Sequence, residues 1–231
     1  MACNLKAPFF EIGPKSYLYG DDILSLALAA DAASEKYDVD VIFTCPVVDI
    51  RRVKEATKRI RVFAPHMDPI PVGRGLADIL PESLVAAGAD GVMLNHVEKS
   101  LDFETLAKTI CRAEEVGLTT IVCADSMADA SKIATLHPDI IVAEPSELIG
   151  TGVSVGPEYV EAAMRSVKSV DENILVLTAA GIANGTDVYN TIIAGADATG
   201  SSSGVAKAAD RAAMVDEMIG AARKAWDERH K

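Results

Sequence analysis

The stretch DIIVAEPSELIGTG, residues 139–152, is the most informative part of this chain. Its first five residues, an aspartate followed by four apolar residues, predict a buried strand. An acidic residue, Glu144, follows this run directly, and the next segment begins with a proline and ends with Gly-Thr-Gly. This order is typical of a carboxylate at the mouth of a parallel sheet, followed by a loop that can close over a small ligand and exclude water.

The same alternation of a short β-branched run and a longer amphipathic segment recurs along the whole chain. The predicted strands cover residues 8–12, 39–44, 60–64, 91–94, 119–123, 139–143, 174–177 and 197–200. The predicted helices cover residues 21–36, 50–57, 77–87, 103–116, 126–136, 157–169, 186–194 and 204–229. These units in 231 residues predict an α/β protein with a single closed (β/α)8 barrel, one domain over residues 1–231. A doubly wound open sheet is the alternative, but no G-x-G-x-x-G motif follows the first strand to support dinucleotide binding.

Composition narrows the classes of function. The net charge of -12 argues against nonspecific binding to nucleic acid or to an anionic membrane. No apolar run approaches the ~18–20 residues of a membrane span, and the N-terminus lacks the apolar core of a signal peptide. The spacing of Cys3, Cys45, Cys111 and Cys123 suits neither zinc nor a disulfide framework. We therefore expect reduced thiols and a cytoplasmic protein.

Polar side chains follow the early and middle predicted strands, and small residues follow the last two. The polar residues at these strand ends are Lys15, His66, Asn95, His96, Glu98, Asp125 and Glu144. The small residues are Ala179, Ala180 and Gly181 after the seventh strand and Ser201, Ser202, Ser203 and Gly204 after the eighth. Because ligands of such barrels bind at the C-terminal ends of the strands, these residues are the candidate site.

Two of these strand ends carry turns of a kind that binds phosphate. Ala180-Gly181-Ile182 and Ser202-Ser203-Gly204-Val205 lack large side chains, so their backbone N–H groups can converge on an anion, and a helix N-terminus adds a favourable dipole. Each turn alone could be a tight strand-to-helix connection. Their occurrence at successive strands favours a phosphate site.

The reactive candidates are Glu144, His96 and Lys15. A shielded carboxylate such as Glu144 can remove a proton from carbon next to a carbonyl group. A neutral imidazole at His96 can donate a hydrogen bond to that carbonyl, and the Lys15 ammonium can neutralise negative oxygen. Each residue also has a purely structural interpretation: Glu144 as a carboxylate at a helix N-terminus, His96 as a structural histidine and Lys15 as a solvated loop lysine. Glu98 is expected to pair with a cation or to cap the following helix. Neither a metal nor a cofactor is expected, because Asp, Glu and His are scattered.

At these residues the chain resembles the triosephosphate isomerase family, particularly its short archaeal-type form. The motifs that carry the resemblance are Leu94-Asn95-His96-Val97-Glu98, Ala143-Glu144-Pro145 with Ile149-Gly150-Thr151-Gly152, Ala180-Gly181-Ile182 before Gly185-Thr186-Asp187-Val188, Ser203-Gly204-Val205-Ala206-Lys207-Ala208, and Pro65-His66-Met67-Asp68-Pro69. The resemblance covers nearly the whole chain and implies the TIM-barrel fold.

The resemblance also implies a role for each candidate. Glu144 would be the base, His96 would polarise the carbonyl group and relay protons, and Lys15 would stabilise negative charge. Residues 145–152 would form a closing lid, with the backbone of Gly150 meeting phosphate. The loop of residues 65–77 is similar to a subunit-docking loop, so a homodimer or a homotetramer is expected.

Three departures from the family pattern fall at the site. The family usually has asparagine two residues before its lysine, where this chain has Gly13. The serine after the histidine is Val97 here, and the Thr-Gly segment of the third loop is Leu76-Ala77. We interpret these changes as retention of the isomerase machinery with altered substrate recognition. The expected substrates are the triose phosphates or a longer phosphorylated ketose such as a tetrulose phosphate.

The sequence is also consistent with two other functions. The same scaffold supports phosphate-binding lyases, aldolases and epimerases, because fold alone does not select chemistry. A non-catalytic sugar-phosphate-binding protein would keep the phosphate turns, but it would need neither a base nor a proton relay.

Overall fold

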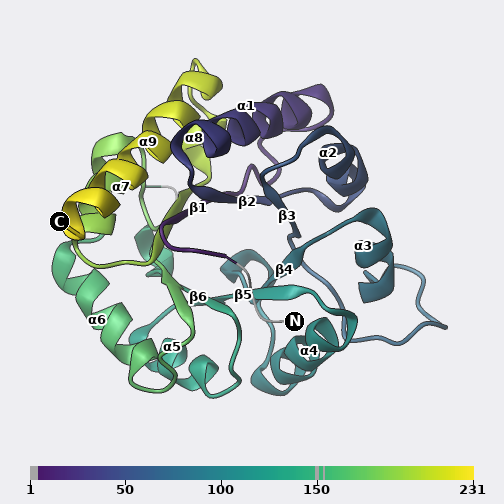
Figure 1. Cartoon of the computed structure of the whole chain (residues 1–231). Coiled ribbons are helices and arrows are strands. Elements are labelled where there is room, and N and C mark those ends of the chain that lie inside the picture. Colours follow the sequence, from purple (N-terminus) through teal and green to yellow (C-terminus); the bar gives the residue numbers. More distant parts are fainter. Residues whose placement is uncertain (1–4, 149–150, 153) are drawn as a thin grey trace.

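The computed structural model describes residues 5–148, 151–152 and 154–231. In this part of the chain, eight parallel strands pair in sequence order and close into one barrel (Figure 1). The strands are β1 (Phe9–Ile12), β2 (Asp40–Thr44), β3 (Arg61–Ala64), β4 (Gly91–Leu94), β5 (Thr119–Ala124), β6 (Ile140–Ala143), β7 (Leu175–Leu177) and β8 (Ala198–Ser201). The predicted (β/α)8 barrel is confirmed.

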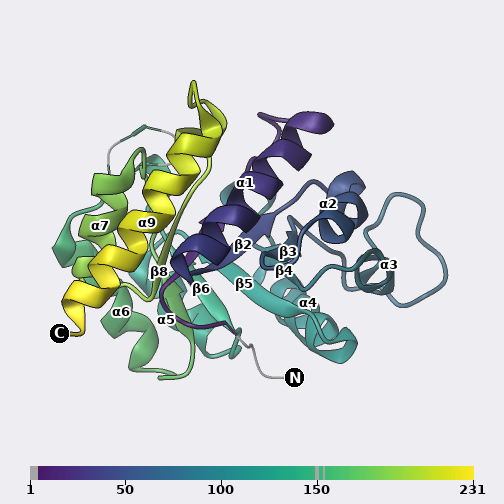
Figure 2. The same cartoon turned by 45° about the horizontal axis from the view of Figure 1, so that its top comes forward.

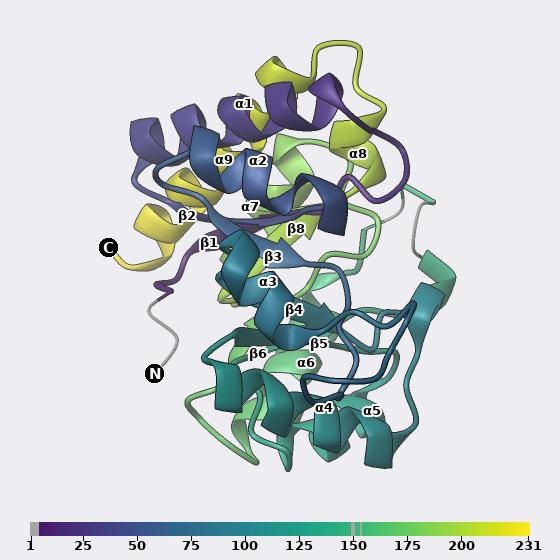
Figure 3. The same ribbon diagram turned by 90° about the vertical axis from the view of Figure 1, so that its right-hand side faces the viewer.

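Helices surround the ring of strands, and Figure 3 shows α1 to α4 following one another around one side. The α-helices are α1 (Asp21–Tyr37), α2 (Ile50–Ala56), α3 (Pro81–Ala87), α4 (Phe103–Val116), α5 (Met127–Ala134), α6 (Pro157–Lys168), α7 (Gly185–Ile193), α8 (Ser203–Ala206) and α9 (Arg211–Arg229). Short 3-10 turns are η1 (Val47–Asp49), η2 (Val97–Lys99) and η3 (Ser146–Leu148). Among the described residues, no helix has the length and hydrophobicity needed to cross a membrane.

Local sequence signals set the helix ends. Helix α4 begins where the Asp102 side chain accepts a hydrogen bond from the backbone N–H of Thr105, and it ends at Gly117 in the left-handed conformation (φ 79°). Two predicted helices differ most from the observed ones. The helix predicted over 77–87 begins only at Pro81, whose ring suits the first helical turn because it has no N–H to leave unpaired. The helix predicted over 204–229 is two helices, because Asp210 caps a new one.

The core has two layers, one on each face of the barrel. Inside the ring, Phe9, Ile42, Phe63 and Leu177 pack together. Gly91 makes room for the Phe63 ring, since a Cβ atom at Gly91 would lie 2.4 Å from its Cζ atom. Alternate strand residues pack outward against the helices, which covers both faces of the sheet.

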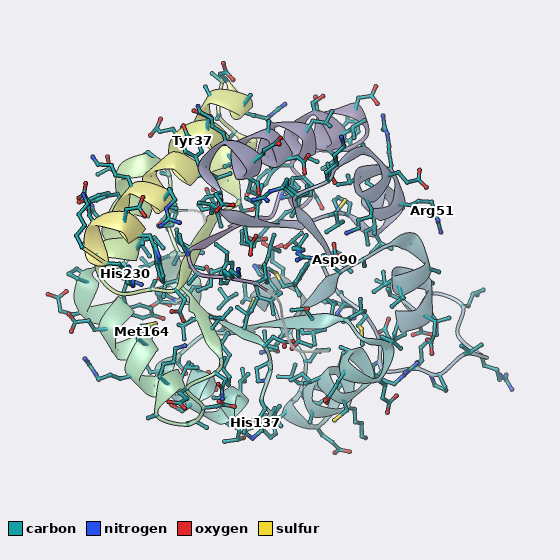
Figure 4. The ribbon with its side chains drawn as sticks, in the orientation of Figure 1. Tyr37, Arg51, Asp90, His137, Met164 and His230 are labelled. Atoms are coloured by element: carbon teal, nitrogen blue, oxygen red, sulfur yellow. The ribbon has the colours of Figure 1, made fainter. Side chains whose placement is uncertain are left out.

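The last helix completes the ring by packing between the first and seventh helices (Figures 1 and 2). Tyr37 lies at the end of α1 (Figure 4). Its hydroxyl group donates a hydrogen bond of 2.9 Å to Oδ2 of Asp216 on α9. The outer face also carries Arg51, His137, Met164 and His230 (Figure 4). The barrel is thus closed by helices as well as by strands, which leaves the loops at the strand ends to form a site.

Candidate active site

A cavity of about 910 Å³ lies at the C-terminal ends of the strands. Its volume is within the range of small-molecule sites. The predicted site residues that line it are Lys15, His96, Glu144, Ala180, Gly181, Ser202, Ser203 and Gly204. The structure therefore brings together residues from the loops after β1, β4, β6, β7 and β8. Gly150, the remaining predicted residue, lies outside the described residues.

Lys15 reaches the cavity from the loop after β1. Its backbone has a φ of 48°, in the left-handed region that non-glycine residues seldom occupy. Such a conformation costs of order 1 kcal/mol and persists only where surrounding contacts fix it. The Nζ atom lies 3.0 Å from Oε1 of Glu98, and the side chain is 24% exposed. The ammonium group is therefore held at the rim of the cavity.

The sequence left two roles open for Glu98, an ion pair with a cation or a cap for the following helix, and the structure shows the ion pair. The hydrogen bond from Lys15, and then the lysine's positive charge, keep the pKa of Glu98 below its usual value. Helix α4 is capped by Asp102 instead. Glu98 therefore links the loop after β4 to the loop after β1.

His96 presents a fixed tautomer to the cavity. It precedes η2, and its Nδ1 atom accepts a hydrogen bond of 3.1 Å from the backbone N–H of Glu98. Because Nδ1 is an acceptor, the proton of the neutral ring is assigned to Nε2. Burial and the positive charge of Lys15 lower the pKa of His96. The side chain is thus a neutral imidazole that can donate an Nε2–H hydrogen bond.

Glu144 follows β6 directly. Its backbone N–H donates a hydrogen bond of 3.2 Å to the carbonyl oxygen of Ala124, which extends the β5–β6 pairing beyond the strand. Burial raises the pKa of Glu144 to about 7; the charge of Lys15 opposes this rise and that of Asp125 adds to it. A carboxylate with such a pKa is suited to accept and return a proton near neutral pH.

The turns after β7 and β8 pack against each other. The Ser201 hydroxyl donates a hydrogen bond of 2.8 Å to the carbonyl oxygen of Ile182. Gly204 is required for this approach, because a Cβ atom there would lie 2.6 Å from Ser201 Oγ and 2.7 Å from the Ile182 carbonyl oxygen. Gly181 has a φ of 74°, which also favours glycine. The first N–H groups of α8 have no acceptor within their own helix and are suited to an anion.

Ser202 ties this region to the loop after β1. Its hydroxyl donates a hydrogen bond of 2.5 Å to the carbonyl oxygen of Gly13. The hydroxyl proton is therefore used within the protein, and Ser202 can offer a ligand its backbone N–H. The contact also fixes the loop that carries Lys15 relative to α8.

Two residues at the floor of the cavity, inside the barrel, were not among the predicted site residues. Glu11 is buried within β1 and Thr44 ends β2; both line the cavity. Thr44 Oγ1 donates a hydrogen bond of 2.5 Å to Oε1 of Glu11. Burial raises the pKa of Glu11 to about 7, although the hydrogen bond from Thr44 opposes the rise. The signal was a single charged residue inside the apolar run of the first strand.

The described cysteines are free and the described acidic and histidine side chains are dispersed. Cys45, Cys111 and Cys123 are free thiols, and Cys3 lies outside the described residues. Burial raises the pKa of Cys45 to about 12, so this thiol is held protonated. Among the described residues, no group of three or more His, Cys, Asp or Glu side chains is arranged to hold a metal ion.

Comparison with known proteins gives one consistent family. The family model described as triosephosphate isomerase matches residues 15–219. The triosephosphate isomerase of Saccharolobus solfataricus is 34% identical over 225 residues, covering 96% of this chain and 99% of that protein. That of Sulfurisphaera tokodaii is 34% identical over 230 residues, covering 97% and 100%. That of Methanothermus fervidus is 35% identical over 203 residues, covering 87% and 91%.

Proposed function

Because this chain belongs to the triosephosphate isomerase family and is an isomerase, we propose that it interconverts the aldose and ketose forms of a small phosphorylated sugar through an enediolate intermediate. One observation carries the proposal. A carboxylate with a pKa of about 7, a neutral imidazole, a lysine and two small-residue turns all line one cavity. The family assignment favours isomerisation over the lyase, aldolase and binding-protein alternatives.

The geometry supports a proton-transfer mechanism. Glu144 takes a proton from the carbon next to the carbonyl group, and the electrons of that C–H bond form the C=C bond of the enediolate. The carbonyl π electrons move to oxygen, where His96 donates its Nε2–H and Lys15 supplies positive charge. Glu144 then returns the proton to the neighbouring carbon, while His96 relays a proton between the two oxygens. A glutamate base and a neutral histidine are the standard assignment for triosephosphate isomerases.

The substrate phosphate is assigned to the turns after β7 and β8. Backbone N–H groups of Gly181, Ser203 and Gly204 can surround an anion there, with Ala180 and Ser202 shaping the turns. Gly150, in the loop that follows Glu144, completes this set in the proposal. No metal or cofactor takes part in it.

The carbon skeleton is that of a triose phosphate or of a longer ketose phosphate such as a tetrulose phosphate. Gly13 supports the longer substrate, because it presents no side chain to the cavity that it lines.

A second copy of this chain is the proposed protein partner. The loop between β3 and α3 projects from the barrel (Figures 1 and 2) and carries Val72 and Leu76, which are 72% and 104% exposed. Exposed apolar side chains on a projecting loop favour contact with another subunit. We propose a homodimer, or a homotetramer built from it. A cytoplasmic location is also proposed, supported by the free thiols.

A panel of substrates tests the proposed function. Three-, four- and five-carbon aldose and ketose phosphates are each incubated with the enzyme, and aldose–ketose interconversion is followed by coupled assay or NMR. We expect interconversion of at least one three- or four-carbon phosphate, and none of the same sugars without phosphate at comparable concentration. Failure of every phosphorylated sugar to react would overturn the proposal.

A further inference from the structure

Glu11 is a polar side chain on a largely apolar cavity floor. It lies within β1, one strand away from Thr44, whose hydroxyl donates to its Oε1 at 2.5 Å. Met93, Val142 and Leu177 also line the cavity, belong to the apolar cluster inside the barrel or pack against it, and carry no polar group except the Met93 thioether. Among the described residues, no group other than the Thr44 hydroxyl hydrogen-bonds the Glu11 carboxyl group. A buried carboxyl group with one partner has capacity for a further hydrogen bond.

Two glycines make room for this carboxyl group and leave it open to the cavity. A Cβ atom at Gly13 would lie 3.0 Å from Oε1 of Glu11. A Cβ atom at Gly200 would lie 3.1 Å from Oε2. Any side chain at position 13 would therefore crowd the carboxyl group or cover it. The absence of one leaves access from the side of the cavity where Gly13 lies.

The surroundings select the kind of group that Glu11 can bind. A carboxylate repels phosphate, so the anionic end of a substrate does not belong here. Glu11 lines the same cavity as Lys15 and Glu144, which are the proposed reacting groups. Lys15 would repel a second cation at this place. A neutral hydroxyl group, which can donate to a carboxylate oxygen, is the remaining polar partner.

Strand register places Glu11 deeper than the phosphate turns. Glu11 pairs with Gly200 of β8, and the turn at Ser202, Ser203 and Gly204 follows two residues later. A substrate held by phosphate at the rim would therefore direct the opposite end of its carbon chain toward the floor. A triose phosphate ends at the reacting carbons. A tetrulose 1-phosphate carries one further hydroxymethyl group beyond them, so the same proton transfer moves its carbonyl group from the second carbon to the third and gives a second ketose.

We propose that Glu11 determines substrate specificity by binding a hydroxyl group on a carbon beyond the two reacting carbons, at the end of the chain remote from phosphate. The preferred substrate is then a tetrulose 1-phosphate, whose carbonyl group moves from the second carbon to the third, so that substrate and product are both ketoses. Thr44 positions the carboxyl group, and Gly13 leaves it accessible. This inference rests on the enediolate isomerisation proposed above and extends it from aldose–ketose to ketose–ketose interconversion.

The test compares two substrates across matched variants. The ratio of kcat/KM for a tetrulose 1-phosphate to kcat/KM for glyceraldehyde 3-phosphate is measured for wild type, Glu11→Leu, Glu11→Gln and Gly13→Ala. Any effect that Glu11 exerts through Glu144 changes both rates and cancels in this ratio. Ile12→Val, on the same strand but facing the outer core, is the control for a general disturbance of β1.

The expected ratio in wild type is at least about 10. Glu11→Leu lowers it by about 10–100-fold, the worth of one hydrogen bond to a charged group. Glu11→Gln restores part of it, because the amide oxygen still accepts a hydrogen bond. Gly13→Ala lowers it in the same direction while keeping Glu11, and Ile12→Val leaves it unchanged.

Three results would overturn the inference. The ratio could stay at the wild-type value in folded Glu11→Leu or, if that variant does not fold, in Gly13→Ala. Wild type could prefer the triose phosphate. In both cases isomerisation persists and the proposed function stands. If wild type isomerises no phosphorylated sugar, both the proposed function and this inference fail.

Discussion

The Nζ atom of Lys15 lies 3.0 Å from Oε1 of Glu98, although 83 residues separate them in the chain. The pair joins the loop after β1 to the loop after β4, next to the backbone N–H that fixes the tautomer of His96. The Glu98 side chain is 65% exposed, so the pair adds less than about 1 kcal/mol to folding stability. The pair instead orients the site, because Glu98 positions both the ammonium group of Lys15 and the imidazole of His96.

The first prediction separates the two members of this pair. Lys15→Met removes the charge that stabilises the developing oxyanion, and we expect kcat/KM to fall by about 10²–10³-fold. Glu98→Gln leaves the ammonium in place and should cost less, on the order of 10-fold, because orientation alone is weakened. Steady-state kinetics on both variants checks this. A larger loss in Glu98→Gln than in Lys15→Met would show that the assigned roles are wrong.

The second prediction concerns stability against pH. Burial raises the pKa of Glu11 from 4.5 in the unfolded chain to about 7 in the fold. The folded state therefore binds more protons between these values, and the free energy of unfolding falls as pH rises through this window. Stability from Glu11 is fully present below about pH 4.5 and is lost as pH passes 7. The change is roughly 3 kcal/mol, since each pKa unit corresponds to about 1.4 kcal/mol.

Glu11→Gln isolates this contribution, because it is neutral at every pH. Its free energy of unfolding relative to wild type should rise by roughly 2–3 kcal/mol between about pH 5 and about pH 8. Urea unfolding at both pH values measures the difference. Glu104→Gln, at an exposed residue on α4, is the matched control and should show little change. A constant difference for Glu11→Gln would mean that this carboxyl group does not titrate in the window.

The third prediction concerns the phosphate turns. Gly204→Ala places a Cβ atom against Ser201 Oγ and the Ile182 carbonyl oxygen, so the turn must shift and its N–H groups move. We expect KM to rise by at least about 10-fold, because a hydrogen bond to a charged group is worth about 1.5–3 kcal/mol. Gly156→Ala adds the same methyl group near only the flexible end of Glu158, and it should leave KM unchanged. An unchanged KM in Gly204→Ala would place the phosphate elsewhere.

The fourth prediction concerns the projecting loop between β3 and α3. A double substitution, Val72→Asp with Leu76→Asp, should shift the enzyme toward monomer, because it places charge within the proposed contact. Sedimentation velocity measures the distribution. Val170→Asp, at an exposed residue between α6 and β7, is the control and should leave the assembly intact. If the double variant keeps the wild-type distribution, the loop is not the contact.

Residues at strand ends were predictable because their signal is local. Glu144 directly follows an apolar run, and the sequence alone placed it at the mouth of the barrel, where the structure has it. The helices predicted to end at residues 87 and 116 do end there, because Gly88 and Gly117 adopt the left-handed backbone that stops a helix.

Features that depend on barrel closure were not predictable. Glu11 lies inside a strand, and alternation along a strand does not reveal which inward positions face a cavity rather than packed side chains. The contact of Ser202 with the Gly13 carbonyl joins residues 189 positions apart. The break before α9 was missed because the apolar pattern continues across it, whereas the cap at Asp210 sets a new helix start.

The most direct test of the account is exchange of substrate hydrogen with solvent. Wild type and Glu144→Gln are each incubated with a phosphorylated ketose substrate in D₂O, and NMR follows deuterium at the carbon next to the carbonyl group. We expect rapid incorporation by wild type and a rate lower by at least about 10²–10⁴-fold in Glu144→Gln, with the affinity for inorganic phosphate retained. Incorporation at the wild-type rate in Glu144→Gln would contradict it, because the proton would then have another acceptor.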